Sequence, residues 1–164
     1  MDNKKQKVLD VFNELQIPYD LEEHPPLFTC FDREKLGLES RGVEYKNLFL
    51  RNKNKSAYYL VSLPVHVRAD IKFMQDRLGE SRLSFGSEET LLDKLHITTG
   101  AVSLLNVIEK ETTDVIFVID DTALQLDEIG FHPNVNTATV YFPPSYIKTI
   151  MEKYGAKYRF VNLN

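Results

Sequence analysis

The chain has 164 residues, of which 43% are hydrophobic and 27% charged, which suits a single folded domain over residues 1–164 and excludes a mostly disordered chain. No apolar run approaches the roughly 20 residues of a membrane span, and no apolar stretch near the N-terminus marks a signal peptide, so we expect no membrane association. The net charge of −4 speaks weakly against a nucleic-acid partner, but residues 46–82 hold eight basic and three acidic residues, so this segment is +5 and the remainder −9.

Hydrophobic spacing predicts an irregular mixture of helices and strands. Apolar residues at helical spacing, with capping and breaker residues, predict five helices. They cover residues 3–15, 31–38, 69–78 and 147–154, and a further helix begins after the N-cap Ser87. Alternating or branched residues predict strands over 19–24, 46–51, 56–63, 101–107, 115–120, 121–127, 137–142 and 157–161. The polar turn 52–55 makes a hairpin of two of these strands. This order predicts the α+β class with a mixed sheet.

Common catalytic and metal-binding signatures are missing from the sequence. It contains no GxGxxG, P-loop, HExxH or CxxC pattern, and its four histidines are widely separated, so we predict neither a cofactor nor a metal site. Cys30 has no neighbouring base or cation that would activate it, and a buried apolar role is the preferred interpretation. A single cysteine cannot form an internal disulfide, which favours a cytoplasmic location.

Two polar segments beside apolar strands are candidate binding sites. Lys46 and Asn47 precede an apolar strand, where they either face solvent or place a cation and an amide at the mouth of a sheet. Gly100 lies among small residues. Its loop is either a simple turn or a place where the backbone N–H groups of Gly100 and Ala101 approach a ligand. On charge alone, the basic segment is best interpreted as a solvated surface.

A third polar segment, residues 132–137, directly precedes an apolar strand. Turn formation explains Pro133 and Asn134 but does not require His132. His132 either orients a substrate or holds the loop by bonding to the backbone, and both interpretations stay open at this point.

Taken in order, these segments resemble the YbaK / prolyl-tRNA-synthetase-associated editing family. The resemblance is carried by KNLFLR at 46–51, YYLVSLP at 58–64, RLSFGSEETL at 82–91, TTGAVSLLN at 98–106 and GFHPNVNTATV at 130–140. EEHPPLFT at 22–29 is similar to the stand-alone PrdX-type (ProX-like) members. The match extends over about residues 8–161 and implies the family's fold, a mixed, partly barrel-like sheet flanked by helices.

The resemblance implies a hydrolase that acts in trans on the aminoacyl ester of mischarged tRNA for proline, with the alanyl ester as the first candidate. The cysteinyl ester, a non-catalytic tRNA-binding or regulatory protein, and a hydrolase of free amino-acid conjugates are the alternatives. The partner would be the tRNA. A complex with prolyl-tRNA synthetase and the oligomeric state are left open.

The resemblance also implies roles for individual residues. Lys46 is expected at the ester or the terminal adenosine, with Asn47 beside it, and the family's glycine loop maps onto Gly100. The His-Pro and Asn-Thr pattern of the family maps onto residues 132–133 and onto Asn136 and Thr137. We expect water to attack the ester and amides of the glycine loop to hold either the oxyanion or the α-amino group. The terminal ribose hydroxyl would carry a proton, because no dedicated general base stands out.

The glycine loop departs from the family pattern Pro-Gly-Ser-Val-(Ser/Thr)-Pro-Phe. Thr99 and Ala101 replace the first proline and the serine, and Leu104 and Leu105 replace the second proline and the phenylalanine. We expect the two leucines to narrow the pocket, so that an alanyl group enters and proline does not. The departure leaves the choice of amino acid more open than the reaction class.

Overall fold

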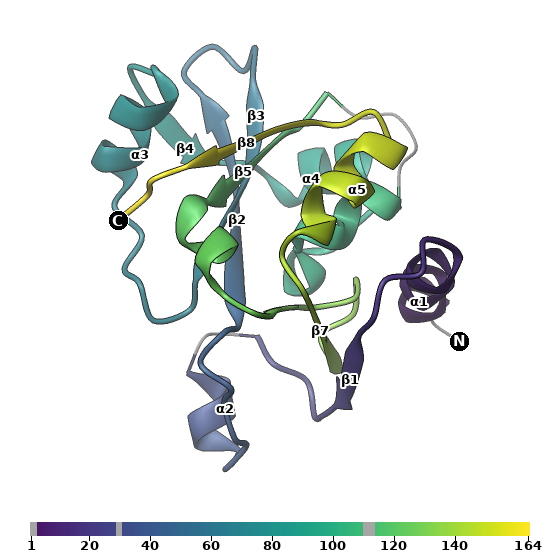
Figure 1. Cartoon of the computed structure of the whole chain (residues 1–164). Coiled ribbons are helices and arrows are strands. Elements are labelled where there is room, and N and C mark those ends of the chain that lie inside the picture. The colour runs from purple at the N-terminus through teal and green to yellow at the C-terminus, as the bar shows by residue number, and fades with distance from the viewer. Residues whose placement is uncertain (1–2, 29–30, 110–113) are drawn as a thin grey trace.

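The helices and strands are described for residues 3–28, 31–109 and 114–164 of a computed structural model (Figure 1). The α-helices are α1 (Lys4–Glu14), α2 (Asp32–Lys35), α3 (Ile71–Leu78), α4 (Glu88–Leu95) and α5 (Tyr146–Lys153). The strands are β1 (Asp20–Glu23), β2 (Tyr45–Asn52), β3 (Tyr58–Pro64), β4 (Leu83–Phe85), β5 (Ile116–Asp120), β6 (Ile129–Phe131), β7 (Ala138–Phe142) and β8 (Lys157–Val161). The 3-10 helices are η1 (Thr99–Ala101), η2 (Leu104–Ile108) and η3 (Asp121–Gln125).

The strands form two sheets. The three-stranded sheet has the order β1-β7-β6 and is antiparallel, and the five-stranded sheet has the order β4-β2-β3-β5-β8. In the larger sheet β3, β5 and β8 are parallel, whereas β2 runs antiparallel to β3 and to β4. A bridge between Glu44 and Gly130 joins the start of β2 to β6. The predicted α+β class is confirmed, and in the described part of the chain the sheets do not close into a barrel.

Apolar side chains on the two faces of the five-stranded sheet build two cores. Leu60 and Phe117 point into the larger core with α1, α4 and α5, whereas Val61 and Val118 point into the smaller core under α3. Successive strand residues face opposite sides, so the apolar runs of β3 and β5 serve both cores. Figure 1 shows this arrangement, with α3 on one side of the sheet and α4 and α5 on the other.

Two predicted strands are wrong. Residues 101–107 form η1 and η2 because polar side chains close the chain locally: Ser103 accepts from the Leu105 amide at 3.2 Å, and the Ser103 amide donates to Asn106 at 2.9 Å. Residues 121–127 begin with η3, where the Asp120 carboxylate accepts from the Thr122 amide at 3.1 Å. Such side-chain bonds compete with a strand ladder.

Most local signals for helix ends are confirmed. The Ser87 side chain accepts from the Thr90 amide at 3.1 Å and caps α4, and Gly79 ends α3 in a left-handed conformation with φ +71°. The short strands β4 and β6 were not predicted, and α2 is shorter than the predicted helix 31–38. Cys30 lies outside the described residues. No described helix has the length and apolar character needed to cross a membrane.

Candidate active site

A cavity of about 420 Å³ lies where the start of β2 meets the three-stranded sheet. Lys46 and Asn47 from β2, Gly100 from η1 and His132 after β6 all line it. These four residues come from three of the polar segments that the sequence singled out, and the fold brings them to one hollow. The remaining lining residues are mainly in the 27–45 segment, and the others are Val65, Thr99, Val102, Gly130 and Thr139.

The Lys46 ammonium has no ion-pair partner among the described residues. Lys46 is the second residue of β2, opposite Leu63 of β3, and its side chain is half-buried at the cavity. A cation that is partly removed from water and has no counter-ion attracts an anionic or electron-rich ligand group. Lys46 can therefore supply positive charge to whatever occupies the cavity.

Asn47 is held in place through its side-chain oxygen. Oδ1 accepts from the Ser62 hydroxyl at 2.6 Å and from the Leu104 amide at 3.1 Å. A backbone amide only donates, so this contact identifies the atom as oxygen and leaves the Nδ2 donors facing the other way. Nδ2 has no partner in the described part of the chain and is not sealed from solvent, so it is available to a ligand.

The glycine loop offers one cavity-lining residue of the predicted pair. Gly100 lines the cavity, whereas Ala101 is buried and its amide donates to the Thr98 carbonyl at 3.0 Å. A Cβ added at Gly100 would lie 3.5 Å from Asn136 Nδ2 and 3.7 Å from the Phe28 ring. Both are ordinary van der Waals distances, so a Cβ would fit here, and sterics do not require glycine.

His132 faces the cavity as a neutral imidazole. Burial, followed by repulsion from His24 and Arg33, lowers the pKa of His132 from 6.5 to about 4. Its ring centroid lies 6.1 Å from that of His24, and its nitrogens have no hydrogen-bond partner among the described residues. At neutral pH this side chain can donate one hydrogen bond and accept another.

The other predicted contact residues lie around the cavity without lining it. Leu104 and Leu105 are fully buried in the larger core, and the Leu104 amide supports Asn47. The Asn136 carbonyl accepts from the Leu27 amide at 2.9 Å, and the Thr137 carbonyl accepts from the His24 amide at 3.0 Å. The leucines therefore belong to the core that supports the site. Residues 136–137 bind the backbone of residues 24–27, of which Leu27 lines the cavity.

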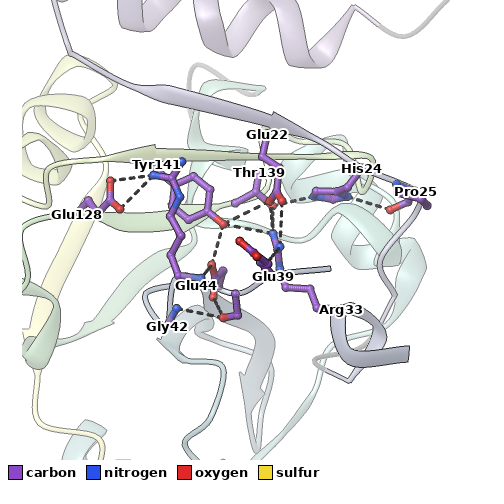
Figure 2. A network of polar contacts seen from close by, with 12 residues as sticks. Glu22, His24, Pro25, Arg33, Glu39, Gly42, Glu44, Glu128, Thr139 and Tyr141 are labelled. Atoms are coloured by element: carbon purple, nitrogen blue, oxygen red, sulfur yellow. Dashed lines mark hydrogen bonds and ion pairs between the residues drawn. The ribbon is translucent and has the colours of Figure 1, made fainter. Parts of the chain in front are cut away.

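Arg33 of α2 also lines the cavity, and the sequence did not indicate this residue (Figure 2). Its guanidinium donates to both carboxylate oxygens of Glu22 on β1, at 2.6 and 3.3 Å, and to Thr139 on β7 at 3.1 Å. His24 contacts the same Thr139 hydroxyl at 2.8 Å and donates from Nδ1 to the Pro25 carbonyl. The hydrogen bond from Arg33 lowers the pKa of Glu22, so the pair is charged.

Glu44, which lines the cavity, and Tyr141 extend this network (Figure 2). The Tyr141 hydroxyl donates to Glu44 at 2.7 Å, and the Arg41 amide donates to the same carboxylate at 2.9 Å. Burial alone would raise the pKa of Glu44, but bonds from Ser40, Tyr141 and Arg41 outweigh it and lower that pKa. A Cβ at Gly130 would approach the Tyr141 ring to 2.8 Å, so glycine is required there. No sequence pattern signalled this network, because its members are distant in the chain.

The chain matches known editing proteins in sequence and in fold. Residues 24–150 match the family model for the aminoacyl-tRNA editing domain. The chain is 36% identical to the prolyl-tRNA editing protein ProX of Acetoanaerobium sticklandii over 97% of both chains. It is 30% identical to prolyl-tRNA synthetase associated domain-containing protein 1 of Xenopus laevis over 92% of both.

Solved structures agree on the fold. A proposed trans-editing enzyme for prolyl-tRNA synthetase superimposes with a TM-score of 0.69 at 16% identity, over 100% of this chain and 99% of that one. The family match identifies the activity as that of an aminoacyl-tRNA deacylase, a hydrolase of the aminoacyl ester. The chain therefore belongs to the aminoacyl-tRNA editing domain family, and Lys46, Asn47, Gly100 and His132 line its open cavity.

Proposed function

We propose that the chain edits mischarged tRNA for proline in trans, and that its substrate is the alanyl ester. One observation carries the proposal: an unpaired cation, a free side-chain amide and a neutral imidazole line the same cavity as Gly100. The name of the ProX relative supports tRNA for proline as the substrate. A cavity of about 420 Å³ lies in the range of small-molecule sites, and we infer that it takes the terminal nucleoside together with the amino acid.

Water attacks the ester carbonyl in this proposal, and the ester bond to the ribose breaks. The amino acid leaves as the carboxylic acid, and the ribose oxygen receives the proton. Lys46 and the Gly100 amide stabilise negative charge on the carbonyl oxygen, and Asn47 Nδ2 donates a further hydrogen bond. His132, being neutral, positions the water or the α-amino group, while the neighbouring ribose hydroxyl relays the proton.

Discrimination against proline is assigned to residues that line the cavity. Leu104 and Leu105 are buried in the core, so they act through the position of Asn47 and η2. Leu27, Phe28 and Val102 are apolar residues of the cavity lining, and the Phe28 ring lies close to Gly100. We propose that they limit the space beside the α-carbon, so that alanine is hydrolysed and the larger proline is excluded.

Replacement of Lys46 tests the mechanism. Lys46→Ala should lower the deacylation rate of alanyl-tRNA for proline by on the order of 10²-fold, because it removes charge that acts in the transition state. Lys35→Ala is the matched control, since Lys35 on α2 is exposed and has no ion pair with a described residue. Equal rates for wild type and Lys46→Ala, measured by ester loss under single-turnover conditions, would exclude this role.

A substrate panel separates the alternatives. Purified protein is incubated with alanyl-, cysteinyl- and prolyl-tRNA for proline, and loss of each ester is followed over time. Faster loss of the cysteinyl ester than of the alanyl ester would identify cysteinyl-tRNA as the substrate. Binding of tRNA without hydrolysis would indicate a non-catalytic member of the family. Addition of prolyl-tRNA synthetase to the assay tests whether that enzyme takes part. We further propose that the protein acts in the cytoplasm, where tRNA is charged.

A further inference from the structure

Unpaired positive charge is concentrated in one part of the chain. Between residues 46 and 82 no basic side chain forms an ion pair with a described residue; these residues are Lys46, Arg51, Lys53, Lys55, Arg68, Lys72, Arg77 and Arg82. Elsewhere, seven of the eleven described basic residues are ion-paired. On a protein of net charge −4, this segment is therefore available to an anionic partner.

Two of these cations share a second hollow. Arg68 and Lys72, both exposed, line an open depression of about 610 Å³ together with Phe73 and the last residues of the structure; we call it the α3 hollow. The Arg77 guanidinium lies 4.8 Å from the centre of the Phe73 ring. The acid in this lining is Asp70, whose carboxylate accepts from the Phe73 amide at 3.1 Å and so caps α3.

The α3 hollow and the candidate active site lie at the same end of the strands of the five-stranded sheet. Lys46 at the start of β2 pairs with Leu63 at the end of β3. Strands β3, β5 and β8 are parallel, and Asp120 pairs with Val161, so the C-terminal ends of these strands lie at the same end of the sheet. Val65 lines the active site, and Arg68, three residues further on, lines the α3 hollow. A chain-like ligand that enters the active site can continue into this hollow.

We propose that the α3 hollow binds the sugar–phosphate backbone of the tRNA acceptor arm, next to the nucleotide whose ester occupies the active site. This inference rests on the proposed function. Arg68 and Lys72 would neutralise phosphates, and the part of Phe73 that lines the hollow would pack on a sugar or base. The acidic remainder of the chain repels tRNA, so the basic segment 46–82 orients the acceptor arm toward Lys46.

Charge reversal tests the surface with the full protein. Arg68→Glu/Lys72→Glu should raise KM for alanyl-tRNA by on the order of tenfold or more, with kcat nearly unchanged, because the contacts act on binding. Lys157→Glu/Arg159→Glu is the matched control, with the same change of charge on exposed residues of β8 that have no ion pair in the described part of the chain. Lys157 is the first residue of β8 and lies at the opposite end of the strands. Melting temperatures check that both variants fold.

A short substrate separates binding of the tRNA from chemistry. The alanyl ester of adenosine alone fills the active site but cannot reach the α3 hollow, so all variants should hydrolyse it at the wild-type rate. In the neutral variant Arg68→Ala/Lys72→Ala, the slope of log(kcat/KM) against log salt should become shallower by about 1.4 for the full tRNA, as expected when two phosphate contacts are lost.

The outcomes distinguish this inference from the proposed function. An equal rise in KM for both charge-reversed pairs, or slower hydrolysis of the short ester by Arg68→Glu/Lys72→Glu, would overturn the α3 hollow as a tRNA site. Failure of wild type to hydrolyse any ester would overturn the proposed function instead. In that case, salt-dependent binding of uncharged tRNA by wild type and the Arg68/Lys72 variants still decides whether the surface binds RNA.

Discussion

At the scale of single residues, polar groups that lack partners stand beside groups that are fully bonded. The Glu44 carboxylate accepts three hydrogen bonds and Arg33 contacts Glu22 and Thr139. In contrast, Lys46 and His132 have no hydrogen-bond or ion-pair partner for their side chains within the described residues. Buried and half-buried polar groups normally find partners, so these open positions indicate where a ligand supplies the missing contacts.

The neutral state of His132 has a consequence for stability. Its pKa is about 4 in the folded protein and about 6.5 when unfolded, so the unfolded chain takes up this proton first as the pH falls. The free energy of unfolding should therefore decrease between pH 6.5 and 4 by up to about 3 kcal/mol on account of this residue. His132→Asn cannot titrate and should lack this part of the decrease.

Denaturant unfolding at pH 7, 5.5 and 4.5 measures the effect. The difference between wild type and His132→Asn isolates His132, because Glu22 and Glu44 titrate in both proteins. A difference that stays constant over this range would contradict a neutral, partly buried His132. Loss of activity in His132→Asn at pH 7 without a lower stability would favour the proposed positioning role.

At the scale of elements, α2 depends on contacts outside itself. It has four residues and none is buried, and isolated helices of this length are unstable in water. The ion pair between Arg33 and Glu22 at 2.6 Å connects α2 to β1, and the Arg33 bond to Thr139 connects it to β7. Arg33, whose side chain is 12% exposed, therefore connects α2 to two strands of the smaller sheet.

Removal of this side chain should release α2. In Arg33→Ala, amide hydrogen exchange of residues 32–38 should become at least tenfold faster, because opening no longer breaks the bonds to Glu22 and Thr139. Exchange in β2 should not change. Lys35→Ala, on the same helix, is the control. If α2 exchanges equally slowly in wild type and Arg33→Ala, other contacts hold α2 in place.

At the scale of the whole molecule, the five-stranded sheet separates a core that supports the active site from one that supports the α3 hollow. Met74→Ala in the smaller core and Leu104→Ala in the larger core each remove a fully buried side chain and should cost about 2–4 kcal/mol of unfolding free energy. Only Leu104 belongs to the segment whose amide holds Asn47.

Activity should therefore differ between two variants of similar stability. With the short alanyl ester, measured well below both melting temperatures, Met74→Ala should keep the wild-type rate and Leu104→Ala should lose several-fold. Equal rates in the two variants would show that the position of Asn47 does not depend on packing in the larger core.

Local signals in the sequence determined the larger elements and the candidate residues. Helix periodicity and caps such as Ser87 and Gly79 act within a few residues, so α1, α3, α4, α5 and the β2–β3 hairpin could be predicted. The motifs that suggested Lys46, Gly100 and His132 are likewise continuous segments. The roles of these residues remain predictions.

Only the tertiary structure decided how the site is built. Residues 104–108 are all buried and carry no period, so their 3-10 conformation depends on bonds to Asn47 and within the turn. The hydrogen-bond network of Arg33, Glu44 and Tyr141 joins residues up to 108 positions apart, and no local pattern encodes such contacts. The sequence alone was enough to indicate the chemistry, whereas the shape of the cavity follows from long-range packing, because side chains distant in the chain supply each other's hydrogen-bond partners.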